Sequence, residues 1–206
     1  RIDVTGNTST RDKVIRREMR VAEGDVFNSF LIERSENRIK SLGYFQEKFT
    51  IEQVEGSTPD RVRLVANVEE GNTGELQLSA GFSSIERFIF SGSIAKRNFR
   101  GLGQEVRASA SYSSYSKSFE VGFTEPYLFN KNIALAGDIF RRDYNSFNYL
   151  GNTRQTTYGN TSTGFQIRTG IPINEYLYFS GRYGLSFENV TLSESTYFVD
   201  PDGTGP

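Results

Sequence analysis

The stretch GELQLSAGF, residues 74–82, decides the fold because apolar and polar residues alternate along it. One set of residues is apolar: Leu76, Leu78, Ala80 and Phe82. The residues between them are polar or small: Glu75, Gln77, Ser79 and Gly81. Successive side chains of a β-strand point to opposite faces, so this period of two predicts a strand with one apolar face.

The same alternation returns six times downstream, at residues 88–94, 106–112, 119–123, 133–139, 165–171 and 177–187. The opposite faces of these segments are polar and partly charged, as at Glu105, Arg107, Ser180 and Arg182. A polar face suits the wet lumen of a membrane β-barrel. It also suits bulk water, so a soluble β-sandwich that binds a ligand remains an alternative.

Connection lengths favour the barrel. Three connections are compact and rich in turn residues, at 98–103, 126–132 and 172–175. The others are residues 83–86, residues 113–117, a long polar run at 141–156 and a tail after residue 189. Outer-membrane barrels have short turns on the periplasmic side and longer loops outside. We therefore predict antiparallel transmembrane β-barrel strands, about seven of them, in residues 73–206.

Composition limits the chemistry that the chain can perform. It has 24 basic and 25 acidic residues, a net charge of -1, so nothing points to nucleic acid. It contains no histidine and no cysteine, which excludes Ser-His-Asp, Cys-His and histidine-zinc sites. We expect no enzymatic activity, no cofactor and no metal site. The sequence lacks an initiator methionine and a signal peptide, so we expect a piece of a longer protein.

Residues 1–72 follow a different pattern and predict a separate α+β domain in the order β-α-α-β-β. A strand at residues 1–5 precedes a helix capped by Ser9 or Thr10, and a second helix starts near Asn28 or Ser29. Gly43 is placed to take the left-handed position after that helix. Two strands follow, at residues 45–54 and 61–70.

Several motifs in this order resemble one known family. They are GNTSTRDKVIRREMRVAEGD at residues 6–25, SLGYF at 41–45, VEEGNTGELQLSAGFSS at 68–84, NFRGLGQEV at 98–106, TEPYLF at 124–129 and GIPINEY at 170–176. Together they resemble the BamA family of outer-membrane protein assembly factors. The resemblance covers nearly the whole chain. It implies that residues 1–72 are the membrane-proximal POTRA domain and that the rest belongs to a barrel of sixteen strands.

The resemblance also implies a function and a set of sites. In this family the first barrel strand lies at a lateral seam and templates the strands of unfolded outer-membrane protein clients. That strand corresponds here to residues 74–82, Gly74 through Phe82. Its small residues, however, also suit a tilted strand that only relieves crowding, and we leave both explanations open.

The POTRA domain would lie in the periplasm and dock a BAM lipoprotein such as BamD. By motif position Arg16 and Glu23 match the family's docking residues, although an exposed Arg and Glu are usually solvated surface charges. A POTRA strand edge, formed by the first or second strand, is a further route to clients. Glu70, Gly71 and Asn72 sit where the POTRA domain meets the barrel, and we predict a hinge there.

Two alternatives keep the architecture but change the activity. A related two-partner secretion transporter exports one partner through the lumen, and a TamA-type transporter serves fewer clients. The GIPINEY and RREMR segments favour the assembly factor.

Overall fold

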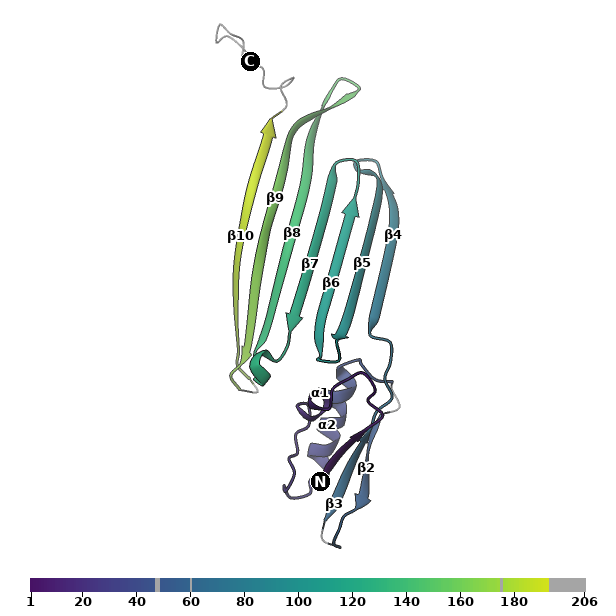
Figure 1. Ribbon diagram of the computed structural model, residues 1–206. Coiled ribbons are helices and arrows are strands. Elements are labelled where there is room, and N and C mark those ends of the chain that lie inside the picture. Colours follow the sequence, from purple (N-terminus) through teal and green to yellow (C-terminus); the bar gives the residue numbers. More distant parts are fainter. Residues whose placement is uncertain (47–48, 60, 175, 193–206) are drawn as a thin grey trace. The chain divides into compact units, whose positions relative to one another are not determined.

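The structure, a computed structural model, describes residues 1–46, 49–59, 61–174 and 176–192 (Figure 1). The chain divides into two compact units. Unit 1 comprises residues 1–74 together with residues 96–105, and unit 2 comprises residues 75–95 and 106–206.

Unit 1 contains a small α+β domain in the predicted order of elements. These are β1 (Ile2–Thr5), α1 (Asp12–Arg16), α2 (Ser29–Ser41), β2 (Thr50–Glu55) and β3 (Val62–Asn67). The sheet order is β1-β3-β2, with β1 parallel and β2 antiparallel to β3. The two edges of this sheet are therefore the first and second strands, as predicted.

Apolar side chains of both helices and the sheet form the core of unit 1. Ile15 of α1, Ile39 of α2 and Ala66 of β3 are fully buried, and Phe49 just before β2 is 2% exposed. Helix α2 packs one apolar stripe inward because its period matches the helical turn. Ile39 lies on this stripe.

The ends of α2 follow from its sequence. The side chain of Asn28 accepts hydrogen bonds from the backbone N–H groups of Phe30 and Leu31, which otherwise lack partners inside the helix. At the other end Gly43 has a φ of 66°, the left-handed conformation that glycine adopts without a steric cost. The start of the helix near Asn28 and the left-handed Gly43 were both predicted.

The predicted caps of the first helix are wrong. Helix α1 is short, its N-cap is Arg11, and no side chain caps it. Ser9 and Thr10 lie one or two residues before the N-cap position, because α1 begins only at Asp12, and their backbone N–H groups donate to the carboxylate of Glu70. The hydroxyl of Thr10 also accepts a hydrogen bond from the Asn98 side chain. Both residues thus make contacts with residues distant in sequence.

The two strands predicted after α2 are present but shorter than expected. Of the ranges 45–54 and 61–70, regular strand covers β2 and β3, and an isolated antiparallel bridge joins Phe45 to Glu70. Residues 47, 48 and 60 lie outside the part that the structure describes.

Unit 2 is built on one antiparallel sheet of seven strands in the order β10-β9-β8-β7-β6-β5-β4 (Figure 1). The strands are β4 (Gly74–Ser83), β5 (Arg87–Phe99), β6 (Gln104–Tyr112), β7 (Ser116–Glu125), β8 (Ala134–Leu150), β9 (Thr153–Pro172) and β10 (Tyr178–Leu192). Each strand neighbours the next one along the chain. The predicted number of strands is confirmed, and the soluble two-sheet sandwich is wrong because all seven strands share one sheet.

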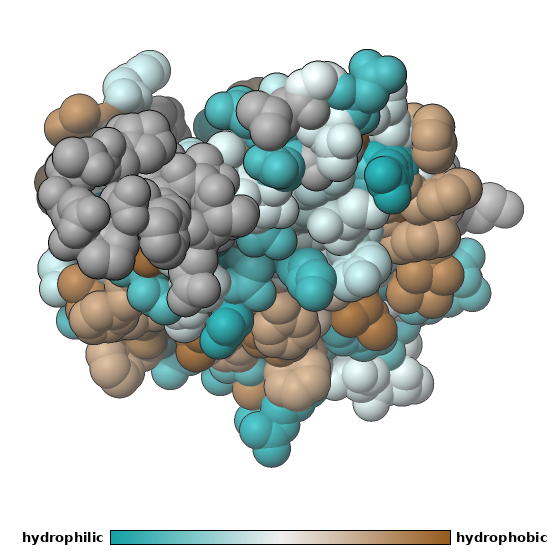
Figure 2. Space-filling model, turned by 90° about the horizontal axis from the view of Figure 1, so that it is seen from above, coloured by the Kyte–Doolittle hydropathy of each residue, from teal (hydrophilic) through white to brown (hydrophobic). Residues whose placement is uncertain are grey.

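One face of this sheet is apolar and uncovered. Leu78 is 75% exposed and Phe187 is 69% exposed, although both are large hydrophobic residues. Seen from above, hydrophobic side chains gather along much of the outer rim (Figure 2). On the other face the hydroxyls of Ser79 and Ser91 pair at 2.5 Å. No helix in the described part of the chain is long and apolar enough to cross a membrane.

The predicted loop at residues 141–156 is wrong. Strands β8 and β9 run through this segment and turn only at Gly151 and Asn152, with an irregularity in register between Ser146 and Phe147. Backbone pairing between the two strands continues through this polar segment, from Arg141 opposite Thr163 to Leu150 opposite Thr153. The tail expected after residue 189 starts as strand up to Leu192, and residues 193–206 lie outside the described part.

Of the three compact connections, the first two agree with prediction. Residues 100–103 form a tight turn between β5 and β6. Residues 126–133 join β7 to β8 through a 3-10 turn, η1 (Leu128–Asn130). In the third, residue 175 is not described, and Asn174 accepts hydrogen bonds from the N–H groups of Tyr176 and Leu177.

Candidate functional site

Strand β4, the predicted seam strand, lies at one end of the described sheet. Its sheet neighbour is β5, and among the described residues no strand pairs with its other edge. An edge strand presents unpaired backbone N–H and C=O groups, which can pair with another extended chain. Strands β4 and β10 are thus the two outermost strands of the described sheet, and the seam at residues 74–82 stays a prediction.

The side chains of β4 place little bulk near its centre. Ser79 and Ala80 are small, and Gly81 has no side chain. A methyl group added at Gly81 would meet no atom within 4 Å, so no close neighbour requires glycine there. Glycine weakens a strand through its backbone entropy, and here that is its main physical consequence.

Arg16 and Glu23, the predicted docking residues, lie together on the surface of unit 1. The guanidinium of Arg16 is 3.6 Å from the Glu23 carboxylate and also pairs with Asp12. Both residues bind the backbone of Ile2: Arg16 donates to its carbonyl at 3.0 Å, and Glu23 accepts from its N–H at 3.0 Å. The pair therefore ties α1 and the following loop to the start of β1.

These contacts shift both ionisable groups toward their charged forms. The hydrogen bond to Asp12 is the main reason that the pKa of Arg16 is raised. The hydrogen bond from the Ile2 N–H lowers the pKa of Glu23. Both side chains keep an exposed portion, 41% for Arg16 and 55% for Glu23. A partner could therefore reach an ordered, fully charged pair.

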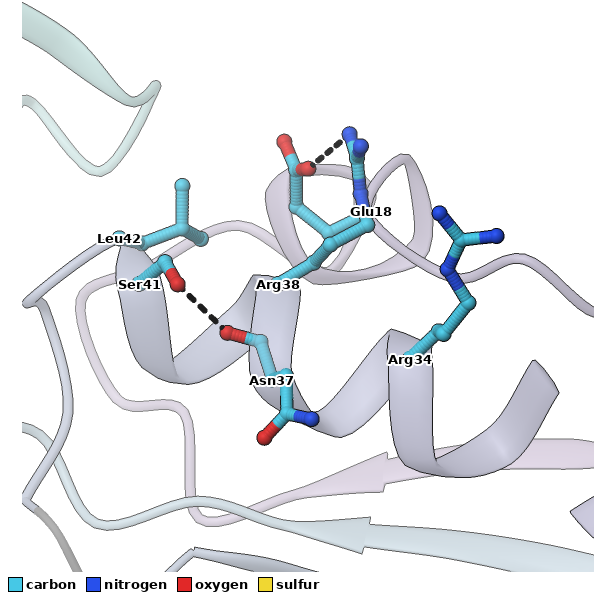
Figure 3. Close-up of a pocket in the computed structure, with 6 residues that line it drawn as sticks. All are labelled: Glu18, Arg34, Asn37, Arg38, Ser41 and Leu42. Carbon is cyan, nitrogen blue, oxygen red and sulfur yellow. Dashed lines mark hydrogen bonds and ion pairs between the residues drawn. The ribbon is translucent and has the colours of Figure 1, made fainter. Parts of the chain in front are cut away.

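A second polar feature of unit 1 is a cavity of about 460 Å³ beside α2. Figure 3 shows Arg38 of α2 and Glu18 joined across it, with Arg34 on the preceding turn of the helix. The Arg38 guanidinium donates to the Glu18 carboxylate at 2.6 Å, and Glu18 is 5% exposed. A buried carboxylate needs such a partner, so this pair joins α2 to the segment after α1.

The predicted hinge residues lie inside a hydrogen-bonded segment of unit 1. The Glu70 carboxylate accepts from the Thr8 hydroxyl at 2.8 Å and from the Thr10 N–H at 2.5 Å. The Gly71 N–H donates to the Tyr44 carbonyl at 2.8 Å, and Asn72 accepts from the N–H of Gly74. A hinge at these residues stays a prediction.

Competing effects set the protonation of Glu70. Desolvation by burial acts to raise the pKa of this carboxyl, but the hydrogen bonds from Thr10, Thr8 and Ser9 together lower it. The group is therefore ionised at neutral pH and accepts several hydrogen bonds at once. Charge-assisted hydrogen bonds of this kind are stronger than neutral ones.

The turn between β5 and β6 belongs to unit 1. Asn98 is 7% exposed, and its side chain donates to the Thr10 hydroxyl at 2.7 Å while accepting from the Gly103 N–H at 2.9 Å. The Arg11 N–H donates to the Gly101 carbonyl at 2.9 Å. Gly101 has a φ of 68°, and any Cβ there would collide with the backbone of Ser9.

In unit 2 a charged cluster lies on the polar face. Asp138 of β8 is 6% exposed and pairs with Arg107 of β6 and, at 2.6 Å, with Arg168 of β9. The Asp138 carboxylate is buried and has two cationic partners. These ion pairs join β8 to β6 and to β9. Alternation along β8 could have identified Asp138. Its neighbours Gly137 and Ile139 lie on the apolar face, so Asp138 lies on the polar one.

Sequence reasoning missed Glu18 and Asn98 as well as Asp138. The partners that decide their roles lie 20 or more residues away: Arg38 for Glu18, Thr10 for Asn98, and Arg107 and Arg168 for Asp138. Within the described residues no group of three or more acidic residues could hold a metal ion.

Comparison with protein families matches both parts of the chain. An Omp85 superfamily domain matches residues 98–202, and a POTRA model described as "Surface antigen variable number repeat" matches residues 1–71. The first match alone spans just over half of the chain.

Several curated relatives are outer membrane protein assembly factors. "Outer membrane protein assembly factor BamA" of Neisseria meningitidis is 32% identical over 93% of this chain. The protein of the same name from Nitratidesulfovibrio vulgaris is 35% identical over 85% of this chain. The chain spans only 24% and 21% of these two relatives, respectively.

Solved structures agree on the fold. BamA from Haemophilus ducreyi lacking POTRA domains 1–3 matches with a TM-score of 0.75 and 25% identity, covering 92% of this chain and 35% of that one. CdiB from Escherichia coli matches with a TM-score of 0.55 at 14% identity, covering 93% of this chain and 41% of that one, which shows a shared fold alone.

Proposed function

The chain belongs to the Omp85 superfamily of the bacterial outer membrane, and we propose that it is part of an assembly factor that folds and inserts outer-membrane proteins. The proposal extends to this chain what the relatives' name, outer membrane protein assembly factor, says of them. The chain acts in this role by binding and templating rather than by catalysis.

The observation that carries the proposal is the edge position of β4. An incoming client strand can add to this edge by β-augmentation, in which backbone hydrogen bonds supply affinity with little demand on sequence. Each net hydrogen bond contributes about 0.5–1.5 kcal/mol, so several together hold a strand while single bonds still break. A template that accepts many different clients needs this combination.

The small residues of β4 assist release. Gly81 and its neighbours lower the intrinsic preference for a regular strand, so β4 can bend and change its partner at a low cost in free energy. The open space at Gly81 supports this role, because no packing contact prevents a larger residue there.

Disulfide trapping tests the templating step. This chain contributes no cysteine of its own, so a Gln77→Cys variant of the complete protein, with any other cysteine replaced, can be paired with a client that carries one cysteine in its terminal strand. We expect a disulfide with the client during assembly. A Ser118→Cys variant is the matched control, because β7 lies between two strands of the sheet.

Equal cross-linking at both positions would contradict templating at β4, because a strand inside the sheet offers no free edge. Absence of cross-linking at Gln77, with assembly otherwise intact, would contradict it as well. Cross-linking confined to Gln77 supports the proposal.

The POTRA domain has a docking role in this proposal. It lies in the periplasm and presents the ordered pair Arg16 and Glu23 to a BAM lipoprotein such as BamD. The support is geometric: the two side chains are 3.6 Å apart, remain partly exposed and are held by the backbone of Ile2. Prearranged charges of this kind favour specificity and rapid association.

A further inference from the structure

A depression in the apolar face of unit 2 lies over Gly137, about 360 Å³ in volume. In the register of the sheet Gly137 pairs with Phe123 of β7 on one side and with Ile167 of β9 on the other. A Cβ added at Gly137 would meet no atom within 4 Å. Glycine therefore forms the floor, and larger side chains form the walls.

The walls are apolar on every side. Ile139 follows two residues along β8 and pairs with Val121 and Phe165 on the flanking strands. All of these side chains keep large exposed fractions, as high as 66% at Ile139. In an outer-membrane protein this face contacts hydrocarbon, and an unfilled depression would lose dispersion contacts on one side.

We propose that the Gly137 depression is a binding site for one acyl chain of a phospholipid. The polar side chain of Asp138 is engaged by Arg107 and Arg168, so the surface of the depression is mainly apolar and suits a hydrocarbon ligand better than a polar one. A flexible hydrocarbon chain fits an irregular apolar space between three strands.

The position of the depression along the strand favours a phospholipid. Strand β8 begins at Ala134, so Gly137 lies about 10 Å from the start of the strand. The connection before β8 carries the exposed Lys131 and the 84% exposed Phe129. An ammonium group suits a lipid phosphate, and aromatic residues favour the membrane interface.

The choice of lipid rests on the proposed function, because there the short connections face the periplasm. The periplasmic leaflet of the outer membrane consists of phospholipid, whereas lipid A occupies the outer leaflet. The depression near this end of β8 is therefore within reach of phospholipid acyl chains.

The test uses the complete protein in bilayer nanodiscs that contain a phospholipid with a photoactivatable diazirine in its acyl chain. We expect cross-links concentrated on Phe123, Ile139 and Ile167. A Gly137→Leu variant fills the depression without a clash and should reduce this labelling about tenfold, the change expected when roughly two methylenes lose their contacts.

A Gly184→Leu variant is the matched control. It makes the same change at a glycine of β10 where an added Cβ would meet only ordinary van der Waals contacts, but on the polar face, and it should leave the labelling at Gly137's neighbours unchanged. Both variants place a better strand former than glycine, so we expect both to fold.

Three results would overturn the proposal: labelling spread evenly over the apolar face, labelling unaffected by Gly137→Leu, or loss of labelling when lipid A or an unfolded client is added in excess. Client insertion, measured separately on the same nanodiscs, distinguishes this site from the proposed function. Lipid labelling at these residues without client insertion would support the lipid site and contradict the proposed insertase function.

Discussion

The two units use apolar residues in opposite ways. In unit 1 Ile15 and Ile39 are fully buried among the helices and the small sheet. In unit 2 Leu78 and Phe187 are more than two-thirds exposed, although their strands are regular. Burial of apolar surface stabilises a domain in water by about 25 cal/mol per Å². Unit 1 obtains that stabilisation from its own core, whereas unit 2 needs a hydrocarbon environment to cover its outer face.

The difference shows what alternation alone means. A period of two establishes that a strand has two unlike faces, but it does not say what covers the apolar one. Ile51 of β2 meets a protein core, and Leu78 of β4 meets the surroundings of the sheet. The cost of a substitution on an apolar face should therefore depend on the protein core in unit 1 and on the surrounding hydrocarbon in unit 2.

The largest expected effect is in the core of unit 1. Phe49→Ala removes a side chain that is 2% exposed and leaves a cavity, so we expect a loss of about 3–5 kcal/mol in the free energy of unfolding. Urea unfolding with proteolysis of unit 1 measures it. Phe30→Ala, at a 61% exposed position of α2, is the control and should cost about 0.5 kcal/mol. Equal costs would contradict the core assignment.

The second effect compares the two faces of β10. Leu185 lies near the middle of the strand on the apolar face, and Ser186 follows it on the polar face. Leu185→Arg should reduce the stability of the membrane-inserted fold by about 2–4 kcal/mol, because the charge faces hydrocarbon. Ser186→Arg should cost far less. Denaturant titrations in lipid vesicles compare the two, and similar losses would show that the face assignment is wrong.

A smaller effect is expected at Glu70. Replacing it with alanine leaves the N–H of Thr10 without this acceptor, at a cost of about 1–3 kcal/mol in the stability of unit 1. Because the folded pKa of Glu70 is lowered, its stabilisation is present above the unfolded pKa of about 4.3 and disappears as the pH falls through the folded value. The stability difference between the wild type and Glu70→Gln should therefore shrink in acid. A difference that grows in acid would contradict the lowered pKa.

The smallest effect on stability is expected at Arg16. Arg16→Ala should change the unfolding free energy by under about 1 kcal/mol, because exposed ion pairs contribute little. Arg16→Glu places like charges beside Glu23 and should weaken binding of the BAM lipoprotein in a pull-down experiment. Lys40→Glu, at an exposed position on α2, is the control. If both reversals weaken binding equally, general charge explains the effect and docking at Arg16 is wrong.

Much of the fold could be predicted because it depends on local patterns. The Asn28 cap, the left-handed Gly43 and the seven alternating segments each depend on residues close in sequence. The errors have a common cause. Helix α1 begins at Asp12, too late for Ser9 or Thr10 to cap it, and these residues instead contact Glu70 and Asn98, which lie far away in the sequence. Residues 141–156 form strands because pairing between β8 and β9 continues up to the turn at residues 151–152.

The sequence by itself determined the two-faced strands, the order of elements in the α+β domain and the absence of histidine and cysteine chemistry. Only the tertiary structure decided which strands lie at edges, that Asp138 joins Arg107 to Arg168, and that Gly137 forms the floor of an apolar depression. The physical reason is range: side-chain alternation and capping act over a few residues, whereas edges, buried ion pairs and depressions arise from segments that meet only when the chain has folded.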